Sequence, residues 1–130
     1  LPTEMEWMFA ARGGNHTNNY TYSGSNNIDE VAWYTTNSGN TTHPVATKAT
    51  NELGFYDMSG NVWELCWDIY SSTLPSGDNP RGPISGTYRV RRGGSWSSYA
   101  SNCTVSNRNN RSAAYGNYIV GFRVCRISLN

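Results

Sequence analysis

Residues 51–68 read NELGFYDMSGNVWELCWD, and this stretch differs sharply from the polar chain that precedes it. Apolar and aromatic side chains gather around Gly54 and Gly60, a composition typical of a buried turn that leads into short strands. The core is expected to be built from large aromatic side chains held by irregular backbone. The five Trp, nine Tyr and thirteen Gly of the chain favour the same interpretation and argue against a helical bundle.

Upstream of this stretch, residues 1–14 predict an amphipathic helix that extends through Arg12. Thr3 and Glu6 have the spacing of a capping box, and a pair of glycines follows as a stop signal. Residues 15–51 are polar and interrupted by Gly, Asn, Ser and Thr, so they predict long loops and short strands rather than another helix.

Downstream, residues 73–86 predict a loop rich in Pro and Gly. Residues 87–96 and 119–127 alternate imperfectly between apolar and polar side chains, and both predict strands. Between them, residues 106–120 show no helical or strand period. The order of these elements predicts an α+β domain in which irregular loops predominate.

The chain has 130 residues, a net charge of +1 and 37% apolar residues, which suits a single domain. No apolar run approaches the ~18 residues of a membrane-spanning helix, and no signal-peptide pattern opens the sequence. Lys and Arg are scattered along it rather than grouped, which excludes the usual electrostatic pattern of a nucleic-acid or acidic-lipid binder. We therefore expect no nucleic-acid partner and no membrane-spanning segment.

The residues most often used in catalysis form no familiar motif. Cys66, Cys103 and Cys125 give neither a C-x-x-C pair nor the spacing of a metal finger. His16 and His43 lie in polar segments without a nucleophile motif of the G-x-S-x-G kind. We expect both histidines to be solvated loop residues.

Four blocks of the sequence carry a family resemblance: LPTEMEWMFAARGG, NELGFYDMSGNVWELCWD, RVRRGGSW and GFRVCR. In this order they resemble the formylglycine-generating-enzyme/sulfatase-modifying-factor domain, a variant of the C-type lectin fold. The resemblance spans nearly the whole chain and implies that fold here. The family domain normally carries a further segment before the LPTE block, so residues 1–130 are expected to be the C-terminal part of one such domain.

The family's oxidase chemistry depends on a pair of cysteines. Members that convert a substrate cysteine to formylglycine use two cysteines, separated by four residues shortly after the GGS block, to bind copper(I). Those positions here hold Ser98 and Cys103, and soft Cu(I) needs both thiolates. We therefore expect no copper and no oxidase activity. A formylglycine-generating oxidase with a displaced cysteine, a related iron-dependent oxygenase and a structural accessory domain stay open as alternatives.

Residues 57–64, DMSGNVWE, resemble the structural calcium loop of the family. The resemblance implies that calcium ligands come from Asp57, Gly60, Val62 and Glu64, which supply the oxygen donors that Ca²⁺ prefers. An equally open alternative is a tight turn in which Glu64 pairs with a buried arginine, Arg92 or Arg123. Calcium-bridged sugar binding is disfavoured, because the chain has no Glu-Pro-Asn, Gln-Pro-Asp or Trp-Asn-Asp element.

One branch of the family is not enzymatic. It consists of the variable proteins of diversity-generating retroelements, found in bacteria, their phages and archaea, in which adenine-directed mutagenesis rewrites a short segment between RGGSW and GFR. Residues 97–120 resemble the product of that process. They contain no Lys, Glu, Gln, Met or Trp, the residues that adenine changes in an Asn codon cannot produce.

The composition of residues 97–120 independently indicates recognition. Tyr provides rigid contact area, while Ser, Gly and Asn provide adaptable hydrogen bonds, as in antibody binding loops. We expect a ligand-binding surface for a protein or other macromolecule, formed by Ser97, Ser98, Tyr99, Asn109, Asn110, Ser112, Tyr115, Gly116, Asn117, Tyr118 and Val120.

Four apolar residues around this surface, Trp96, Cys103, Val105 and Phe122, are expected to be buried scaffold. The resemblance further implies a location outside the cell, on the bacterial cell surface or on a phage particle. A merely solvated connection without a ligand is the alternative interpretation of residues 97–120.

Overall fold

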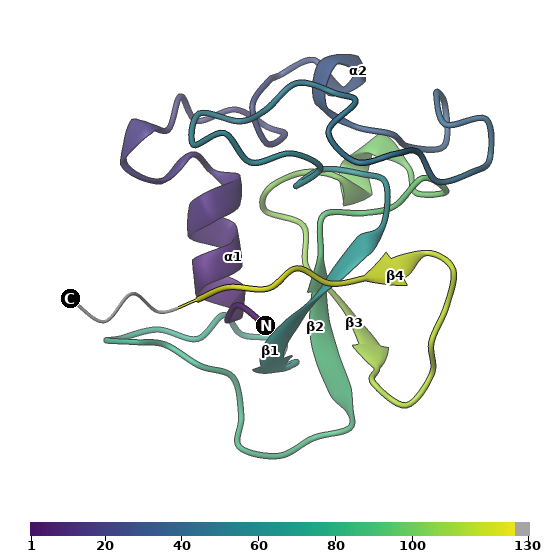
Figure 1. Cartoon of the computed structure of the whole chain (residues 1–130). Helices are drawn as coiled ribbons and strands as arrows, with labels where there is room; N and C mark the ends of the chain where they lie inside the picture. The colour runs from purple at the N-terminus through teal and green to yellow at the C-terminus, as the bar shows by residue number, and fades with distance from the viewer. Residues whose placement is uncertain (127–130) are drawn as a thin grey trace.

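The computed structural model describes residues 1–126. It contains a four-stranded sheet and few helices, an α+β architecture in which most of the remaining backbone is irregular. Figure 1 shows α1 beside β1 and β2, with the loops between α1 and β1 gathered beyond one end of the strands. The helices are α1 (Glu4–Ala11), η1 (Gly14–His16), α2 (Ile28–Val31) and η2 (Ala100–Asn102), of which η1 and η2 are 3₁₀ turns.

Local sequence rules account for α1. The Thr3 hydroxyl accepts a hydrogen bond from the backbone N–H of Glu6, and the Glu6 carboxylate accepts one from the N–H of Thr3 at 2.7 Å. This reciprocal pair confirms the predicted capping box. Gly13 follows the helix at φ 87°, in the left-handed region that favours glycine at a helix end.

The sheet has the strand order β3-β2-β1-β4. The antiparallel strands β1, β2 and β3 are Trp63–Ile69, Tyr88–Arg92 and Asn109–Ser112, and the short strand β4, Val120–Gly121, runs parallel to β1. The predicted strand in residues 87–96 is thereby confirmed over its first half.

The core lies between α1 and one face of this sheet. Trp7 and Ala11 of α1 pack against Cys66 of β1 and Val90 of β2, with Met58 and Val105 completing the cluster. Burial of this apolar area is the main stabilising contribution, at roughly 25 cal/mol per Å². The predicted burial of residues 51–68 holds for their second part, where Met58 and Cys66 join this cluster and Trp63 is 3% exposed. Leu53, Phe55, Tyr56 and Trp67 are exposed instead.

Two polar segments contain elements that their composition hides. The short helix α2 lies within residues 15–51, where no helix is expected, and Asn27 caps it by accepting a hydrogen bond from the N–H of Asp29. Strand β3 lies within residues 106–120 and consists of Asn, Asn, Arg and Ser. Its backbone pairs with β2. The strand is therefore determined by backbone hydrogen bonds to β2 and not by alternating apolar residues.

The C-terminal strand is shorter than predicted. Of residues 119–127, only Val120 and Gly121 form a strand, because they pair with just two residues of β1. Ile127 lies outside the described residues. Phe122, expected to be buried scaffold, is 67% exposed, since the chain leaves the sheet immediately after Gly121. In the described part of the chain, no helix has both the length and the apolar character needed to cross a bilayer.

Candidate ligand-binding surface

Three exposed tyrosines dominate the surface of residues 97–120. Tyr99, Tyr115 and Tyr118 are 74%, 71% and 79% exposed. Tyr99 precedes η2, whereas Tyr115 and Tyr118 belong to the loop between β3 and β4. Tyrosines in solvent gain no burial energy in the isolated protein, so their side chains are available for a partner.

Trp96 joins the two loops that carry these tyrosines. Its ring stacks on Tyr118 with ring centroids 6.0 Å apart, and its indole N–H lies 3.5 Å from the Tyr118 carbonyl oxygen. At the start of the loop between β3 and β4, the guanidinium of Arg111 donates a hydrogen bond to the Tyr115 carbonyl at 3.3 Å. Trp96 is partly rather than fully buried, and it contributes to the surface as well as to the scaffold.

The eleven predicted contact residues divide by exposure. Ser97, Tyr99, Tyr115, Gly116 and Tyr118 are exposed, and Ser98, Asn109, Asn110, Ser112, Asn117 and Val120 are half-buried.

Several of the half-buried residues already have partners in the chain. The Asn117 side chain accepts a hydrogen bond from the N–H of Ile119, and the Asn109 side chain accepts two from Arg91 at 3.3 Å. The Ser98 hydroxyl accepts the N–H of Ser95 at 3.0 Å. The structure therefore separates residues free to meet a ligand from residues that shape the backbone.

Buried residues anchor the same segment to the core. Cys103 is fully buried and Val105 is 7% exposed, as expected for scaffold. Gly94 approaches so closely that an added Cβ would lie 2.6 Å from the Cys103 sulfur, and its φ of 74° also requires glycine. The Cys103 carbonyl accepts the Ser59 hydroxyl at 2.7 Å.

Arg108 is a second anchor, which the sequence interpretation missed. Its guanidinium binds the carboxylate of Glu4, which is completely buried at the start of α1. Glu4 offers the signal that could have revealed it, because a carboxylate on the buried side of a helix needs a cationic partner. Composition alone gives no hint that one arginine in a polar segment serves the core.

The position of the copper-binding pair of the family is occupied by a hydroxyl and a protonated thiol. Burial raises the pKa of the Cys103 thiol to about 12, an effect that exceeds the lowering by a hydrogen bond from the Gly60 backbone. Its S–H lies 3.7 Å from the carbonyl oxygen of Tyr99. In the metal-free chain Cys103 is therefore a thiol at neutral pH, and Cu(I) would have to displace its proton to bind the sulfur.

In the loop at residues 57–64, the predicted calcium ligands face different surroundings. One oxygen of Asp57 accepts the Ala46 N–H at 2.8 Å, and the other is enclosed with no hydrogen-bond partner among the described residues. The Arg123 guanidinium also lies close enough to Asp57 for the two charges to interact. Glu64 is occupied: its carboxylate accepts two hydrogen bonds from Arg123, each 2.6 Å, and one from the Trp7 indole.

The alternative turn, in which Glu64 pairs with Arg123, is thus present in the structure. Arg92, the other candidate, pairs with Glu4 instead. Gly60 adopts φ 77° and packs against the Trp33 backbone, so the loop conformation itself needs glycine there.

One expectation about the histidines is wrong. His43 is half-buried, and its ring stacks on Trp33 with centroids 3.7 Å apart. Its Nε2 lies 2.6 Å from the Ser38 carbonyl oxygen. His43 therefore packs and hydrogen-bonds within the loops and is not a freely solvated residue. His16 is exposed, as expected.

Comparison with known proteins agrees with this architecture. The model of the sulfatase-modifying factor enzyme 1-like domain matches residues 1–127. The chain is 43% identical over 123 residues to the chaperone protein LppX of Paenibacillus barcinonensis, covering 82% of this chain and 41% of that protein. It is 36% identical over 121 residues to the formylglycine-generating enzyme of Thermomonospora curvata, covering 79% of this chain and 40% of the enzyme.

Among solved structures, Treponema denticola variable protein 1 matches with a TM-score of 0.84 and 43% sequence identity. The match covers 94% of this chain and 45% of that one. It confirms the predicted fold, the C-type lectin fold in its formylglycine-generating-enzyme variant. The chain spans less than half the length of each of these three proteins.

Proposed function

We propose that this chain, which belongs to the family of sulfatase-modifying factor enzyme 1-like domains, is a ligand-binding variable protein of a diversity-generating retroelement. The observation that carries the proposal is the division of one segment into two kinds of residue. Tyr99, Tyr115 and Tyr118 project into solvent, whereas Cys103 and Val105 are buried. The likeness to a variable protein of known structure supports the same function.

The proposed ligand is a protein or other macromolecule. The three tyrosines stand more than two-thirds exposed rather than enclosing a cavity, a geometry that suits a broad partner surface and not a small molecule. Tyrosine is a frequent hot-spot residue, and a few such side chains supply most of the energy of an interface. We also propose that the protein acts outside the cell, on a bacterial surface or on a phage particle, where a diversified binder meets its targets.

A display library tests the proposal without knowledge of the natural ligand. The five exposed positions 97, 99, 115, 116 and 118 are randomised, and protease resistance reports the fraction of clones that fold. A matched library randomises the same number of anchored positions, including 103, 105 and 108. We expect most clones of the first library to fold and some of them to bind a model protein such as lysozyme. Most clones of the second library should unfold.

Comparable unfolding of both libraries would contradict the proposal. The gene gives a second test: a near-copy of the coding sequence for residues 97–120 that differs only at adenines, beside a reverse transcriptase gene, is the expected arrangement. A unique segment with no such copy would count against a diversified function.

A formylglycine-generating oxidase is the second candidate, supported by the identity with an enzyme of that kind. It requires Cys103 to have a thiolate partner. Titration of the reduced protein with Cu(I), followed by an oxygen-dependent assay on a cysteine-containing sulfatase peptide, separates the two. Stoichiometric copper binding with conversion of the peptide cysteine would favour the oxidase.

A further inference from the structure

The face of the sheet that points away from α1 carries a group of arginines. Side chains alternate between the two faces of a strand, and directly opposed residues of an antiparallel pair share a face. Arg91 lies opposite Leu65 of β1 and Asn109 of β3, and Arg89 lies opposite Arg111. We call the set Trp63, Trp67, Arg89, Arg91, Asn109 and Arg111 the outer face.

Neutral groups hold these arginines in place. The Arg91 guanidinium lies 4.5 Å from the centroid of the Trp63 ring and donates to the Asn109 side chain, while its Nη1 is enclosed with no partner among the described residues. The Arg89 guanidinium lies 5.2 Å from the Trp67 ring and donates to the Trp67 carbonyl. Both side chains are therefore held close to the sheet instead of extending into solvent.

The charge of this group is not neutralised within the described residues. None of the three arginines has a carboxylate within 4.0 Å, since the ion pairs of residues 1–126 join Glu4 to Arg92 and Arg108, and Glu64 to Arg123. Arg89 and Arg111 lie directly opposite each other, an arrangement of like charges that destabilises a sheet. Burial, and after it the charge of Arg111, lowers the pKa of Arg91.

We infer that the outer face binds an acidic segment of a protein ligand, whose Asp or Glu carboxylates pair with Arg89 and Arg111. Arg91 adds its positive charge from beneath, since its own donors are enclosed or bound to Asn109. This inference deepens the proposed function and rests on it for the existence of a protein ligand. Guanidinium groups form paired hydrogen bonds with carboxylates, and these are strong where solvent is excluded. Trp67, which is 52% exposed, adds apolar contact area beside the charges.

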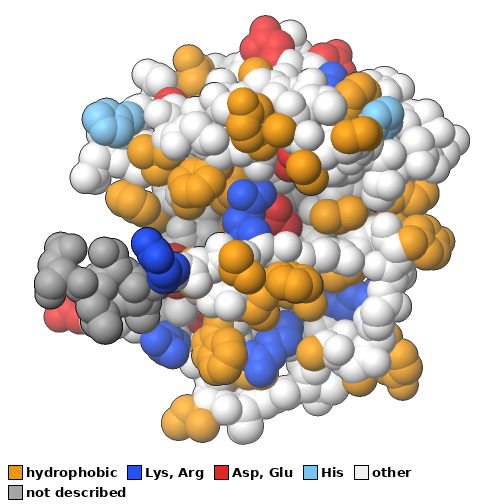
Figure 2. Space-filling model, in the orientation of Figure 1, with side chains coloured by type: hydrophobic (Ala, Val, Ile, Leu, Met, Phe, Trp, Pro, Cys, Tyr) orange, Lys and Arg blue, Asp and Glu red, His pale blue; other side chains and the backbone are white. Residues whose placement is uncertain are grey.

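The surroundings favour a protein ligand over nucleic acid or an anionic membrane. The net charge of the chain is only +1, so the attraction is local and lacks the extended field that favours nucleic acid or an anionic membrane. Arg111 also links the outer face to the tyrosines, because it hydrogen-bonds the Tyr115 backbone. In Figure 2, blue basic side chains lie among orange apolar ones in the region of the strands.

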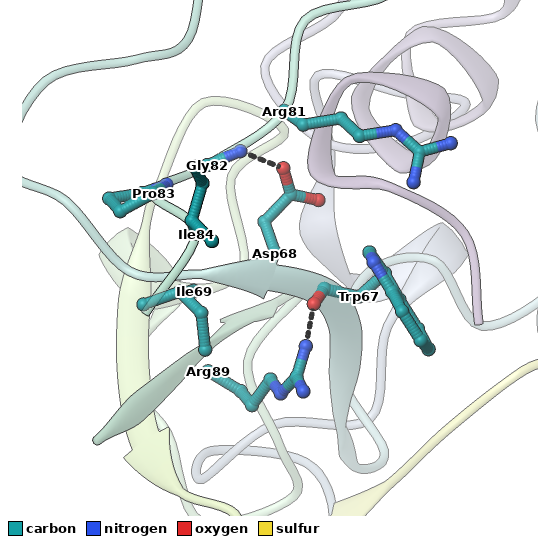
Figure 3. A pocket seen from close by; sticks show the side chains of 8 residues that line it. All are labelled: Trp67, Asp68, Ile69, Arg81, Gly82, Pro83, Ile84 and Arg89. Atoms are coloured by element: carbon teal, nitrogen blue, oxygen red, sulfur yellow. Dashed lines mark hydrogen bonds between the residues drawn. The ribbon is translucent and has the colours of Figure 1, made fainter. Parts of the chain in front are cut away.

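A cavity of about 300 Å³ opens at one end of the outer face. Figure 3 shows Arg81 on the loop above Asp68 and Arg89 on β2, with the Arg89 guanidinium directed at the Trp67 carbonyl. Asp68 also lines the cavity, but its two oxygens already accept the N–H groups of Glu4 and Gly82, each at 2.6 Å. The lining of the cavity therefore combines two arginines with one carboxylate, and of these three residues only Arg89 belongs to the outer face.

Fluorescence anisotropy with labelled deca-glutamate tests the inference at an ionic strength of about 0.01 M, where screening is weak. We expect the wild type to bind this peptide and the double variant Arg89→Gln/Arg111→Gln to bind it at least about tenfold more weakly, the change that about 1.4 kcal/mol produces. Arg12→Gln is the matched control. It removes one positive charge from the end of α1, on the other side of the sheet, as many as the single variant Arg111→Gln removes, and should leave the affinity within about twofold.

Three results would overturn the inference: no binding of deca-glutamate to the wild type, equal loss in Arg12→Gln, or tighter binding of oligothymidine or phosphatidylserine vesicles that needs the same arginines. Melting curves show whether the double variant folds, and the single variant Arg111→Gln should weaken binding in the same direction. The library described above leaves positions 89, 91 and 111 unchanged. Unfolding of that library would contradict the proposed function, whereas absence of peptide binding would contradict only the role of the outer face.

Discussion

The guanidinium of Arg108 binds the carboxylate of Glu4 through two hydrogen bonds, from Nε to Oε1 at 2.6 Å and from Nη2 to Oε2 at 2.7 Å. Arg92 lies within 3.3 Å of the same carboxylate, which is fully shielded from solvent. Arg108 also donates to the Ser71 carbonyl at 2.9 Å. The first residue of α1 is thereby tied to the middle of the proposed variable segment, across most of the chain.

Replacement of Glu4 by Gln should lower the free energy of unfolding by about 3–5 kcal/mol, because two guanidinium groups lose their anionic partner in a buried site. Urea denaturation followed by tryptophan fluorescence measures the change. Glu6→Gln is the control: Glu6 is exposed, and Gln also completes a capping box, so the expected loss is below about 0.5 kcal/mol. Similar losses in both variants would contradict the role of Glu4.

Tyr115→Ala and Tyr118→Ala should leave the melting temperature nearly unchanged, since both side chains are mainly solvated and the stacking of Tyr118 on Trp96 contributes at most about 1 kcal/mol. Val105→Ala, a truncation in the core, should cost about 2 kcal/mol. Differential scanning calorimetry compares the three. Unfolding of either Tyr variant near room temperature would make that tyrosine a core residue and remove it from the proposed surface.

The sequence predicts those parts of the fold that local rules specify. The capping box of Thr3 and Glu6 follows from spacing, and the burial of Met58 and Cys66 follows from the composition of residues 51–68. Strand β3 cannot be predicted in this way, because its polar residues form a strand only through backbone pairing with β2. The exposure of Phe122 is a further tertiary effect, since it depends on how far β4 pairs with β1.

The candidate site shows the same division. Composition identifies the exposed tyrosines, whereas it cannot separate Asn117, which hydrogen-bonds its own loop, from a free asparagine. Scattered arginines in the sequence become a group only in the sheet, where register places Arg89 opposite Arg111. Contacts of this kind depend on strand pairing between distant segments, and no local pattern encodes them.

The three thiols should react in two classes. Cys125 is exposed, whereas Cys66 and Cys103 are fully buried and burial raises the pKa of both thiols. Iodoacetamide at pH 8 should therefore modify Cys125 in the native protein and the other two only in denaturant, as counted by intact mass. Rapid alkylation of native Cys103 would show that its thiol is accessible and would revive the copper-binding alternative.

The stability of the fold should decrease with pH on the alkaline side. A thiol whose pKa is raised in the folded state binds its proton more tightly there than in the unfolded chain. The stabilisation is complete below the ordinary pKa of about 8.5 and is lost as pH rises toward about 12, the value for Cys103. Between pH 8 and 11, the free energy of unfolding should fall less with rising pH in Cys103→Ala than in the wild type. Equal slopes would contradict the assignment of this effect to Cys103.

We propose that Ca²⁺ binds the loop at residues 57–64 through the enclosed oxygen of Asp57, with backbone carbonyls as further donors. Millimolar CaCl₂ should then raise the melting temperature relative to EDTA, and MgCl₂ should not. Asp57→Asn keeps the side-chain oxygen that accepts the Ala46 N–H but removes the charge, and should abolish the shift. An identical melting temperature with and without Ca²⁺ would leave the loop held by Arg123 and Glu64 alone.

The anchoring of residues 97–120 by Cys103, Val105 and Arg108 has a consequence for a population of variants. Changes at the exposed tyrosines leave those anchors in place, so variants with different surfaces should unfold equally rarely and be degraded at equal rates. Each newly written copy would then reach the same abundance as its parent. Selection could act on what each variant recognises, without a competing selection for survival of the fold.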